Sequence, residues 1–120
     1  MTIEVISFKD TPKTINKRSL RDLPDRVVDG DPKHISSVYF DSEDGVITSG
    51  TWTSSPGKWH AFTGKEEFCY IVAGHCRLIS EDGTAKDYKK GDAFFIPDGF
   101  KGYWEVIETT TKHYVVRKTE

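Results

Sequence analysis

The sequence contains few cysteines, no long hydrophobic segment and no excess of charge of either sign, and each absence excludes a class of protein. Only two of the 120 residues are cysteines, Cys69 and Cys76. Their spacing matches neither a C-x-x-C pair nor a disulfide framework. We interpret both as small buried apolar residues that remain free thiols in a reducing compartment.

No segment reaches the roughly 18 consecutive apolar residues that indicate a membrane-spanning helix. The first residues also lack the basic and apolar pattern expected of a leader peptide. Lysine and arginine number 17 against 19 aspartates and glutamates. A chain so nearly balanced offers no electrostatic basis for binding nucleic acid or an anionic membrane. We therefore expect a cytoplasmic protein whose partners include neither.

The sequence also lacks any long segment with a helical period. From Ile35 onward, short apolar segments alternate with turn signals such as Asp44-Gly45, Asp82-Gly83 and Pro97-Asp98-Gly99. This pattern predicts a single all-β sandwich or barrel domain over residues 31–120. The expected strands are 36–41, 46–53, 58–63, 67–73, 75–80, 85–88, 93–97, 102–107 and 112–118.

Residues 1–30 differ from the rest, because prolines and scattered charges surround one short apolar segment, Ile3-Val5-Ile6-Phe8. We expect an N-terminal arm with one edge strand at most and a helical turn near 19–23. An exposed apolar strand tends to pair with a sheet edge, so we expect a homodimer whose contact includes this arm. A loosely ordered terminus is the alternative.

Glu67 is the most informative residue, because it stands at the start of an apolar strand. Alternation along this strand places Glu67, Cys69 and Ile71 on one face. A buried carboxylate must be paired, hydrogen-bonded or bound to a metal, because burying it alone costs several kcal/mol. By the same alternation Lys112 shares a face with Tyr114, so an inward Lys112 could pair with Glu67.

The chain resembles the cupin superfamily, whose first motif is G-x5-H-x-H-x3-4-E-x6-G and whose second is G-x5-P-x-G-x2-H-x3-N. Glu67 and Gly74 have the spacing that ends the first motif, and Gly91, Pro97 and Gly99 have the spacing that begins the second. The chain is most similar to small single-domain cupins grouped with ureidoglycine aminohydrolase and with ethanolamine-utilisation Q-type proteins. The resemblance covers about residues 27–118. It implies a cupin (RmlC-like) double-stranded β-helix, or jelly-roll barrel, with a pocket between its sheets and often a homodimer.

The resemblance also shows where ligands of the cupin metal are missing. His60 aligns with the first motif histidine, but Phe62, Gly102 and Val106 occupy three other motif positions. A transition-metal site of nitrogen and oxygen ligands usually needs three or four protein groups. We therefore expect no tightly bound metal or other cofactor, and any divalent ion would be held weakly by His60 and Glu67.

Two functions remain open at this point. In the first, the protein is a small-molecule enzyme in which Glu67 and His60 do acid–base chemistry and Lys112 fixes an anionic group. In the second, it is a non-catalytic module that binds a small anionic, amino-acid-like or ureido-like metabolite. The expected substrate-binding side chains are Phe62, Cys69, Trp104 and Tyr114. Weaker candidates are His34, His75 and His113, and the aromatic residues expected to pack in the core or at the rim are Trp52, Trp59, Phe94 and Phe100.

Overall fold

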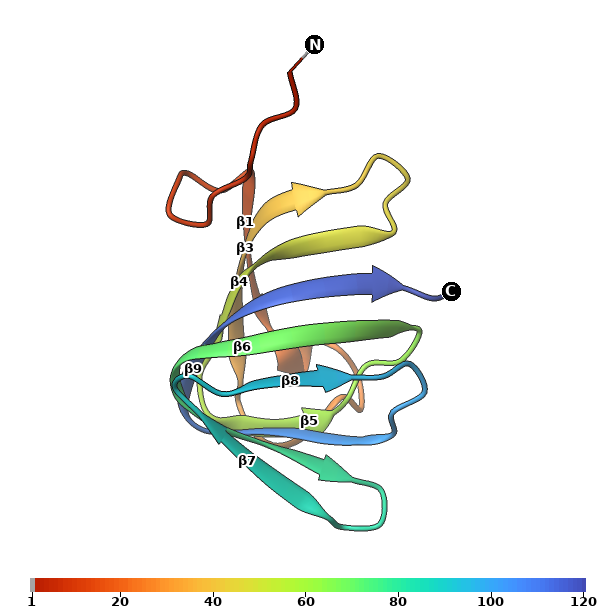
Figure 1. The fold of residues 1–120 in the computed structure, drawn as a ribbon. Coiled ribbons are helices and arrows are strands. Elements are labelled where there is room, and N and C mark those ends of the chain that lie inside the picture. The colour runs from red at the N-terminus through yellow and green to blue at the C-terminus, as the bar shows by residue number, and fades with distance from the viewer. Residues whose placement is uncertain (1) are drawn as a thin grey trace.

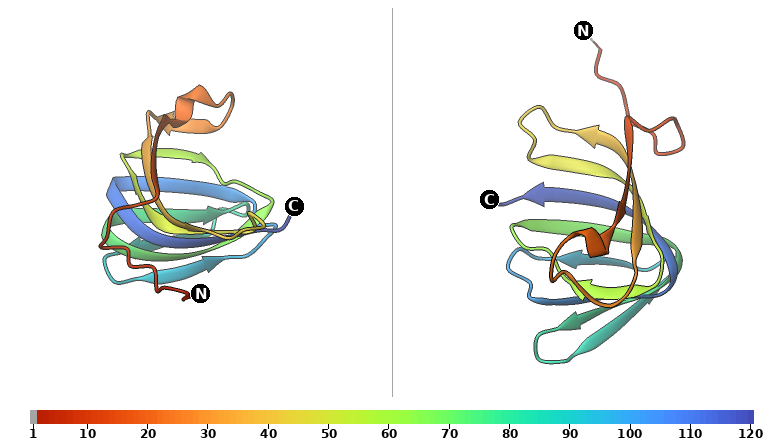
Figure 2. Two further views of the ribbon diagram at one scale, coloured as in Figure 1. Left: turned by 90° about the horizontal axis from the view of Figure 1, so that it is seen from above. Right: turned by 180° about the vertical axis from the view of Figure 1, so that it is seen from behind.

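The computed structural model describes residues 2–120 and shows a single antiparallel sheet that curls around a central space (Figure 1). The only helical element in this range is a short 3-10 turn, so none of its helices is long and apolar enough to span a membrane. Views from above and from behind show the sheet strongly curled into the shape of a barrel, with β1 and β2 at the two ends of its main hydrogen-bonded path (Figure 2). The elements are β1 Thr14–Ser19, η1 Leu20–Asp22, β2 Val27–Gly30, β3 Lys33–Asp41, β4 Ile47–Ser54, β5 Gly57–His60, β6 Lys65–Ser80, β7 Ala85–Lys89, β8 Ala93–Ile96 and β9 Gly102–Lys118.

Two long strands, β6 and β9, organise the barrel by pairing with each other along most of their length. We predicted two shorter strands in place of each, and this was wrong. The register shifts between Ile71 and Cys76, so β6 bends without ending. Gly74 allows the bend, because its φ of +99° lies in a region that side chains rarely adopt. Strand β9 also pairs with β4 and β5, while β6 also pairs with β7 and β8.

The N-terminal residues are placed differently from our prediction. No strand forms at 3–8, and Ile3 and Val5 are 94% and 95% exposed. Instead β1 pairs with β3 and β2 pairs with β5. The sequence of β1, TINKRS, has no continuous apolar pattern, so its strand depends on pairing with β3. The predicted helical turn at 19–23 is confirmed by η1, whose Leu20 is fully buried in the core.

The core fills one part of the barrel interior and leaves a cavity in the rest. Its centre is a group of three tryptophans, Trp52, Trp59 and Trp104, with ring centroids 5.6–6.2 Å apart. These are all of the tryptophans in the chain. Beneath them pack the remaining buried residues of the core, namely Leu20, Cys69, Ile71, Cys76, Leu78, Val106 and Tyr114.

Candidate functional site

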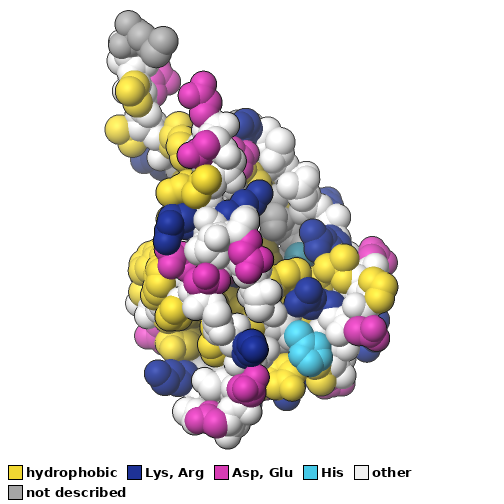
Figure 3. Space-filling model, turned by 90° about the vertical axis from the view of Figure 1, so that its right-hand side faces the viewer, with side chains coloured by type: hydrophobic (Ala, Val, Ile, Leu, Met, Phe, Trp, Pro, Cys, Tyr) yellow, Lys and Arg dark blue, Asp and Glu magenta, His cyan; other side chains and the backbone are white. Residues whose placement is uncertain are grey.

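A cavity of about 430 Å³ lies inside the barrel. Its walls come from both ends of the sequence, because β1, β3, β4, β5, β6, β8 and β9 all contribute side chains to the lining. Figure 3 shows the molecule from the right-hand side of Figure 1. On this face, lysine and arginine side chains lie next to acidic side chains. The lining residues are Asn16, Arg18, His34, Ser36, Thr48, Trp52, Trp59, Ala61, Phe62, Lys65, Glu67, Ile96, Trp104, Lys112, Tyr114, Val116 and Lys118.

A buried ion pair lies at the centre of this lining. Lys112 Nζ donates a hydrogen bond to Glu67 Oε2 at 2.7 Å, and the two residues are only 4% and 7% exposed. The prediction that the two side chains face inward and meet is therefore confirmed. The pairing follows from register, because Ile71 lies opposite Lys112 and strand alternation places Glu67 on the same face of β6.

Both members of the pair are held in their charged forms. Burial by itself would raise the pKa of Glu67, but the nearby Lys112 and Lys65 outweigh it and the pKa lies below its usual range. Burial would likewise lower the pKa of Lys112, but Cys69 and Glu67 outweigh it and the pKa lies above its usual range. The Lys112 ammonium also lies 4.4 Å and 4.2 Å from the ring centroids of Trp52 and Trp104, which adds cation–π attraction.

Further cations surround the pair without an acidic partner of their own. Lys65 and Lys118 lie directly opposite each other on β6 and β9, and both line the cavity. Among the described residues, neither lysine has a carboxylate within salt-bridge distance, nor does Arg18. Burial, and to a lesser extent the positive charge of Lys112, lowers the pKa of Lys65 despite the opposing effect of Glu67. The cavity thus has four cations, Arg18, Lys65, Lys112 and Lys118, against the single carboxylate of Glu67.

His34 supplies a neutral polar group to the same cavity. Burial, with a smaller contribution from Lys112, lowers the pKa of His34 to about 4, so the ring is uncharged at neutral pH. The ring contacts Trp52 and Trp59 edge-on, at centroid distances of 4.9 Å in both cases. Its Nε2 is buried and has no hydrogen-bond partner among the described residues. A buried polar atom in this state can be satisfied by a ligand in the cavity.

Three of the expected substrate-binding residues, Phe62, Trp104 and Tyr114, do line the cavity. Cys69, the fourth, is fully buried and is not part of the lining. Burial raises the pKa of the Cys69 thiol to about 12, so it is protonated at neutral pH and packs against the ion pair.

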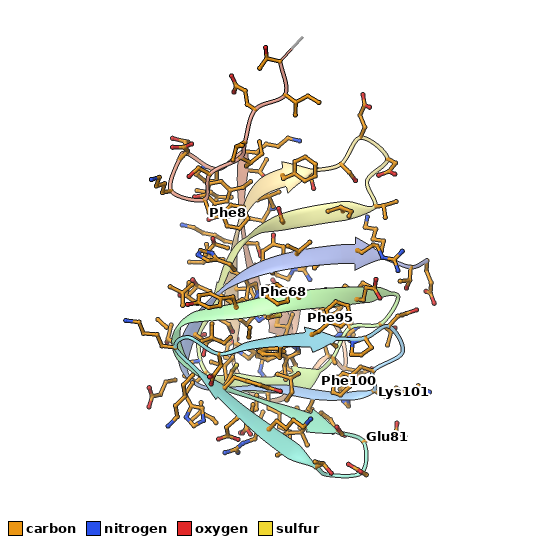
Figure 4. The ribbon with its side chains drawn as sticks, viewed as in Figure 1. Phe8, Phe68, Glu81, Phe95, Phe100 and Lys101 are labelled. Carbon is orange, nitrogen blue, oxygen red and sulfur yellow. The ribbon has the colours of Figure 1, made fainter. Side chains whose placement is uncertain are left out.

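His60 does not meet Glu67, contrary to our expectation. Trp59 is the inward residue of β5, so alternation directs His60 outward, where it is exposed and contacts Tyr103 at 5.0 Å. Strand β5 also ends at His60 and not at residue 63. His60 lines a second hollow of about 330 Å³ with Glu81 and Lys101. Figure 4 labels Glu81 and Lys101 at the lower right of the barrel.

Sequence reasoning missed several cavity residues. Lys65 and Lys118 could have been found by extending the alternation one step back from Glu67 and three steps forward from Lys112. We expected Trp52 and Trp59 only to pack in the core or at the rim, and we considered His34 a weaker candidate for the site. All three line the cavity. Arg18 gave no signal, because nothing in its local sequence predicts that β1 joins the barrel beside β3.

The donor set of this cavity does not suit the metal that the cupin pattern implies. The carboxylate of Glu67 is already paired with the Lys112 ammonium, and His60 lies elsewhere. Phe62 and Val106 have no donor atoms. At Gly102 a side chain would collide with the carbonyl oxygen of Ile79, which lies 2.0 Å from an added Cβ. Within residues 2–120 no three His, Cys, Asp or Glu side chains cluster in a way that could hold an ion.

Comparison with protein families gives a match to the EutQ-like cupin domain over residues 41–114, which is more than half of the chain. The chain belongs to the EutQ-like cupin family. This confirms the resemblance drawn from the two partial motifs, and with it the double-stranded β-helix fold. No curated protein sequence matches this cupin.

Solved structures agree on the fold of this cupin. The Clostridium difficile EutQ protein aligns with a TM-score of 0.64 at 18% identity, covering 86% of this chain and 82% of that one. Ectoine synthase from P. lautus aligns with a TM-score of 0.67 at 13% identity, covering 97% and 78%. A protein of unknown function from Pseudomonas syringae pv. tomato aligns with a TM-score of 0.75 at 22% identity, covering 89% of this chain but only 46% of its own. At these identities the likeness concerns the fold alone.

Proposed function

We propose that this cupin binds a small anionic metabolite inside its barrel, without a tightly bound metal. The observation that carries the proposal is the pair of lysines that lie opposite each other with no acidic partner, Lys65 and Lys118. Like charges directly opposite on neighbouring strands are destabilising. An anion between them would relieve this repulsion and gain two charge-assisted hydrogen bonds.

The rest of the lining suits the body of such a ligand. The tryptophan rings offer flat apolar surface, while the Glu67 carboxylate can accept a hydrogen bond at Oε1, the oxygen that does not receive Lys112. His34 Nε2 offers one further polar contact. A carboxylate that also carries amino or ureido N–H groups would satisfy the lysines, Glu67 and His34 together.

The ion pair favours binding over acid–base catalysis. A general base works best when its pKa lies near the working pH. Here the neighbouring lysines move the pKa of Glu67 in the opposite direction, below its ordinary range. His60, the expected partner in such chemistry, lies outside the cavity. We therefore place the non-catalytic function ahead of the enzymatic one.

The test is a binding screen read by tryptophan fluorescence, because every tryptophan of the chain lines the cavity. The probes are small carboxylates, amino acids and ureido acids, each compared with its neutral amide. We expect carboxylates to change the emission and the amides not to. Lys65→Met and Lys118→Met should each weaken binding by about tenfold or more, the loss expected for a charged hydrogen bond.

Lys58→Met is the matched control, because Lys58 lies outside the cavity over the Tyr103 ring. It should leave affinity unchanged. Equal binding of acids and amides, or equal losses in all three variants, would overturn the proposal. Elemental analysis of untagged protein tests the metal separately. A stoichiometric transition metal that survives dialysis and is lost in Glu67→Gln would contradict the metal-free site.

A further inference from the structure

The side of the cavity formed by β1 and β3 carries four polar side chains, arranged as two opposite pairs. Arg18 lies opposite His34, and Asn16 lies opposite Ser36, in the register of β1 with β3. Residues two apart on a strand share a face, and all four of these residues line the cavity. We call them the β1–β3 polar patch. In the view from behind, Figure 2 shows β1 crossing the near side of the barrel.

The β1–β3 polar patch has unused hydrogen-bonding capacity. The side chains of Asn16, Arg18 and Ser36 form no hydrogen bond or ion pair with another residue in the described range 2–120. Nε2 of His34 is buried and also lacks a partner among these residues. Buried polar groups in folded proteins are nearly always satisfied, so His34 points to a polar group that the cavity receives.

The positive charge of the cavity exceeds what a single acidic group of a ligand can balance. Lys112 and Glu67 neutralise each other. The remaining cations of the lining are Arg18, Lys65 and Lys118, none of which has a carboxylate within salt-bridge distance among the described residues. A ligand with one acidic group leaves two of these three charges unpaired, whereas a diacid leaves only one.

The β1–β3 polar patch and the lysine pair lie at different levels of the barrel. Lys65 is the first residue of β6, and Lys118 is the last residue of β9. Asn16 of the patch is instead at the level of Lys112, to which successive register pairs on β3 and β4 connect it. A ligand that contacts both places must be elongated. The cavity volume of about 430 Å³ is within the range of ordinary ligand pockets.

The two sets of cations nevertheless act on the same space, as the imidazole of His34 shows. Burial and then the charge of Lys112 lower the pKa of His34. The charges of Arg18 and Lys65 lower this pKa further. Charges carried by β1 and by β6 therefore reach one ring, so a single ligand can contact both.

We propose that the β1–β3 polar patch binds a second acidic group of the same ligand, so that the cavity selects an elongated diacid over a monoacid. This selection rests on the proposed function, which places the first acidic group between Lys65 and Lys118. The planar guanidinium of Arg18 holds a carboxylate or a phosphate through two parallel hydrogen bonds. The amide of Asn16 and the hydroxyl of Ser36 can donate to the same group.

The test compares linear dicarboxylates of increasing chain length with their monoamides, which have the same size and one charge fewer. Isothermal titration calorimetry gives the affinity of each. We expect the diacid of matching length to bind about tenfold or more tightly than its monoamide, the gain expected for one charged hydrogen-bonded contact. Carboxylic acids with a phosphate at the far end distinguish the two acidic groups, and tighter binding of either type than of the monoamide supports the proposal.

Arg18→Met should remove the preference for the diacid and leave the affinity for the monoamide unchanged. Arg18 is exposed and forms no ion pair with the other described residues, so folding should survive, as circular dichroism will verify. Lys17→Met is the matched control, because Lys17 lies on the same strand, carries the same charge and does not line the cavity. It should keep the preference for the diacid.

The outcomes separate the second acidic group from the proposed function. Equal affinities for diacids and monoamides, a preference that survives in Arg18→Met, or an equal loss in Lys17→Met would overturn the second acidic group alone. Lys65→Met would in that case still weaken the binding of every acid. If no acid binds, or if Lys65→Met binds acids as tightly as wild type does, the proposed function fails and the diacid fails with it.

Discussion

At the scale of residues, the central feature of the cavity is the contact between the Glu67 carboxylate and the Lys112 ammonium group. In a metal-binding cupin the first-motif glutamate faces an ion, whereas here it faces an ammonium group at 2.7 Å. Taking two charges out of water costs several kcal/mol each, and only close geometry and further contacts offset that cost. The two tryptophan rings beside Lys112 supply such contacts.

Removing one member of this pair should destabilise the fold strongly. We expect Glu67→Gln and Lys112→Met each to lower the free energy of unfolding by about 3–5 kcal/mol, because the remaining charge stays buried without its partner. The double variant should lose less than the sum of the single losses. Denaturant unfolding of the four proteins gives the coupling energy. Additive losses below about 1 kcal/mol each, as for an exposed pair, would contradict the buried contact.

His34 should make stability depend on pH in the mildly acidic range. Its pKa is about 4 in the folded protein against 6.5 when unfolded, so the unfolded chain binds a proton first as the pH falls. Stability is therefore fully present above pH 6.5 and is lost as the pH drops from 6.5 toward 4, by about 2–3 kcal/mol in total. Unfolding of wild type and His34→Gln across this range checks the effect. An unchanged pH slope in the variant would assign the loss to other groups.

At the scale of elements, the barrel depends on one strand that bends without breaking. Gly74 lies inside β6 between register shifts, and an added Cβ would come within 2.3 Å of the Thr109 carbonyl oxygen. Strand β9 is so close at this point that a side chain has no space. The glycine therefore meets two requirements at once, a left-handed φ and the close approach of a neighbouring backbone.

Comparing Gly74→Ala with Gly83→Ala separates these two requirements. Both glycines have similar φ angles, +99° and +92°, but Gly83 has nothing within 4 Å of an added Cβ. We expect Gly83→Ala to cost about 1–2 kcal/mol from backbone strain. Gly74→Ala should cost about 2 kcal/mol more, because the neighbouring strand must also move. Equal losses in thermal or denaturant unfolding would mean that β9 tolerates the methyl group.

At the scale of the whole molecule, residues 14–30 are part of the barrel and not an appendage to it. β1 adds an edge strand beside β3, η1 buries Leu20 completely, and Arg26 donates hydrogen bonds to the carbonyls of His60 and Ala61. The residues before Phe8 form no strand, and Ile3 and Val5 are almost fully exposed. A truncation intended to remove an arm must therefore end before Phe8.

Two truncations test this view. A chain that begins at Ser7 keeps every strand and should retain the β-type circular dichroism spectrum and a cooperative thermal transition. A chain that begins at Val27 loses β1 and the buried Leu20, whose apolar contribution alone is about 1.5–3 kcal/mol. It should lack a cooperative transition at 25 °C or above. Native-like melting of the Val27 chain would show that β1 and η1 add little.

The local sequence determined the approximate positions of most strands after residue 33, the family and the inward direction of Glu67 and Lys112. These features depend on alternation with a period of two and on the spacing of turn glycines, and both can be read within a few residues. The meeting of Glu67 with Lys112 could be inferred as well, because a buried carboxylate requires a partner.

The tertiary structure alone decided which of the remaining polar groups share the cavity. His60 turned outward because β5 buries Trp59, and β1 brought Arg18 inward although its own sequence is polar. His34 became a neutral, unpaired ring only when Trp52 and Trp59 closed over it. Such outcomes depend on which distant strands become neighbours and on bulges such as the one at Gly74, which change the facing of every residue beyond them. Pairing between distant strands is not a property of any short stretch of sequence, so the position of Arg18 beside the cavity lysines emerges only in the folded barrel.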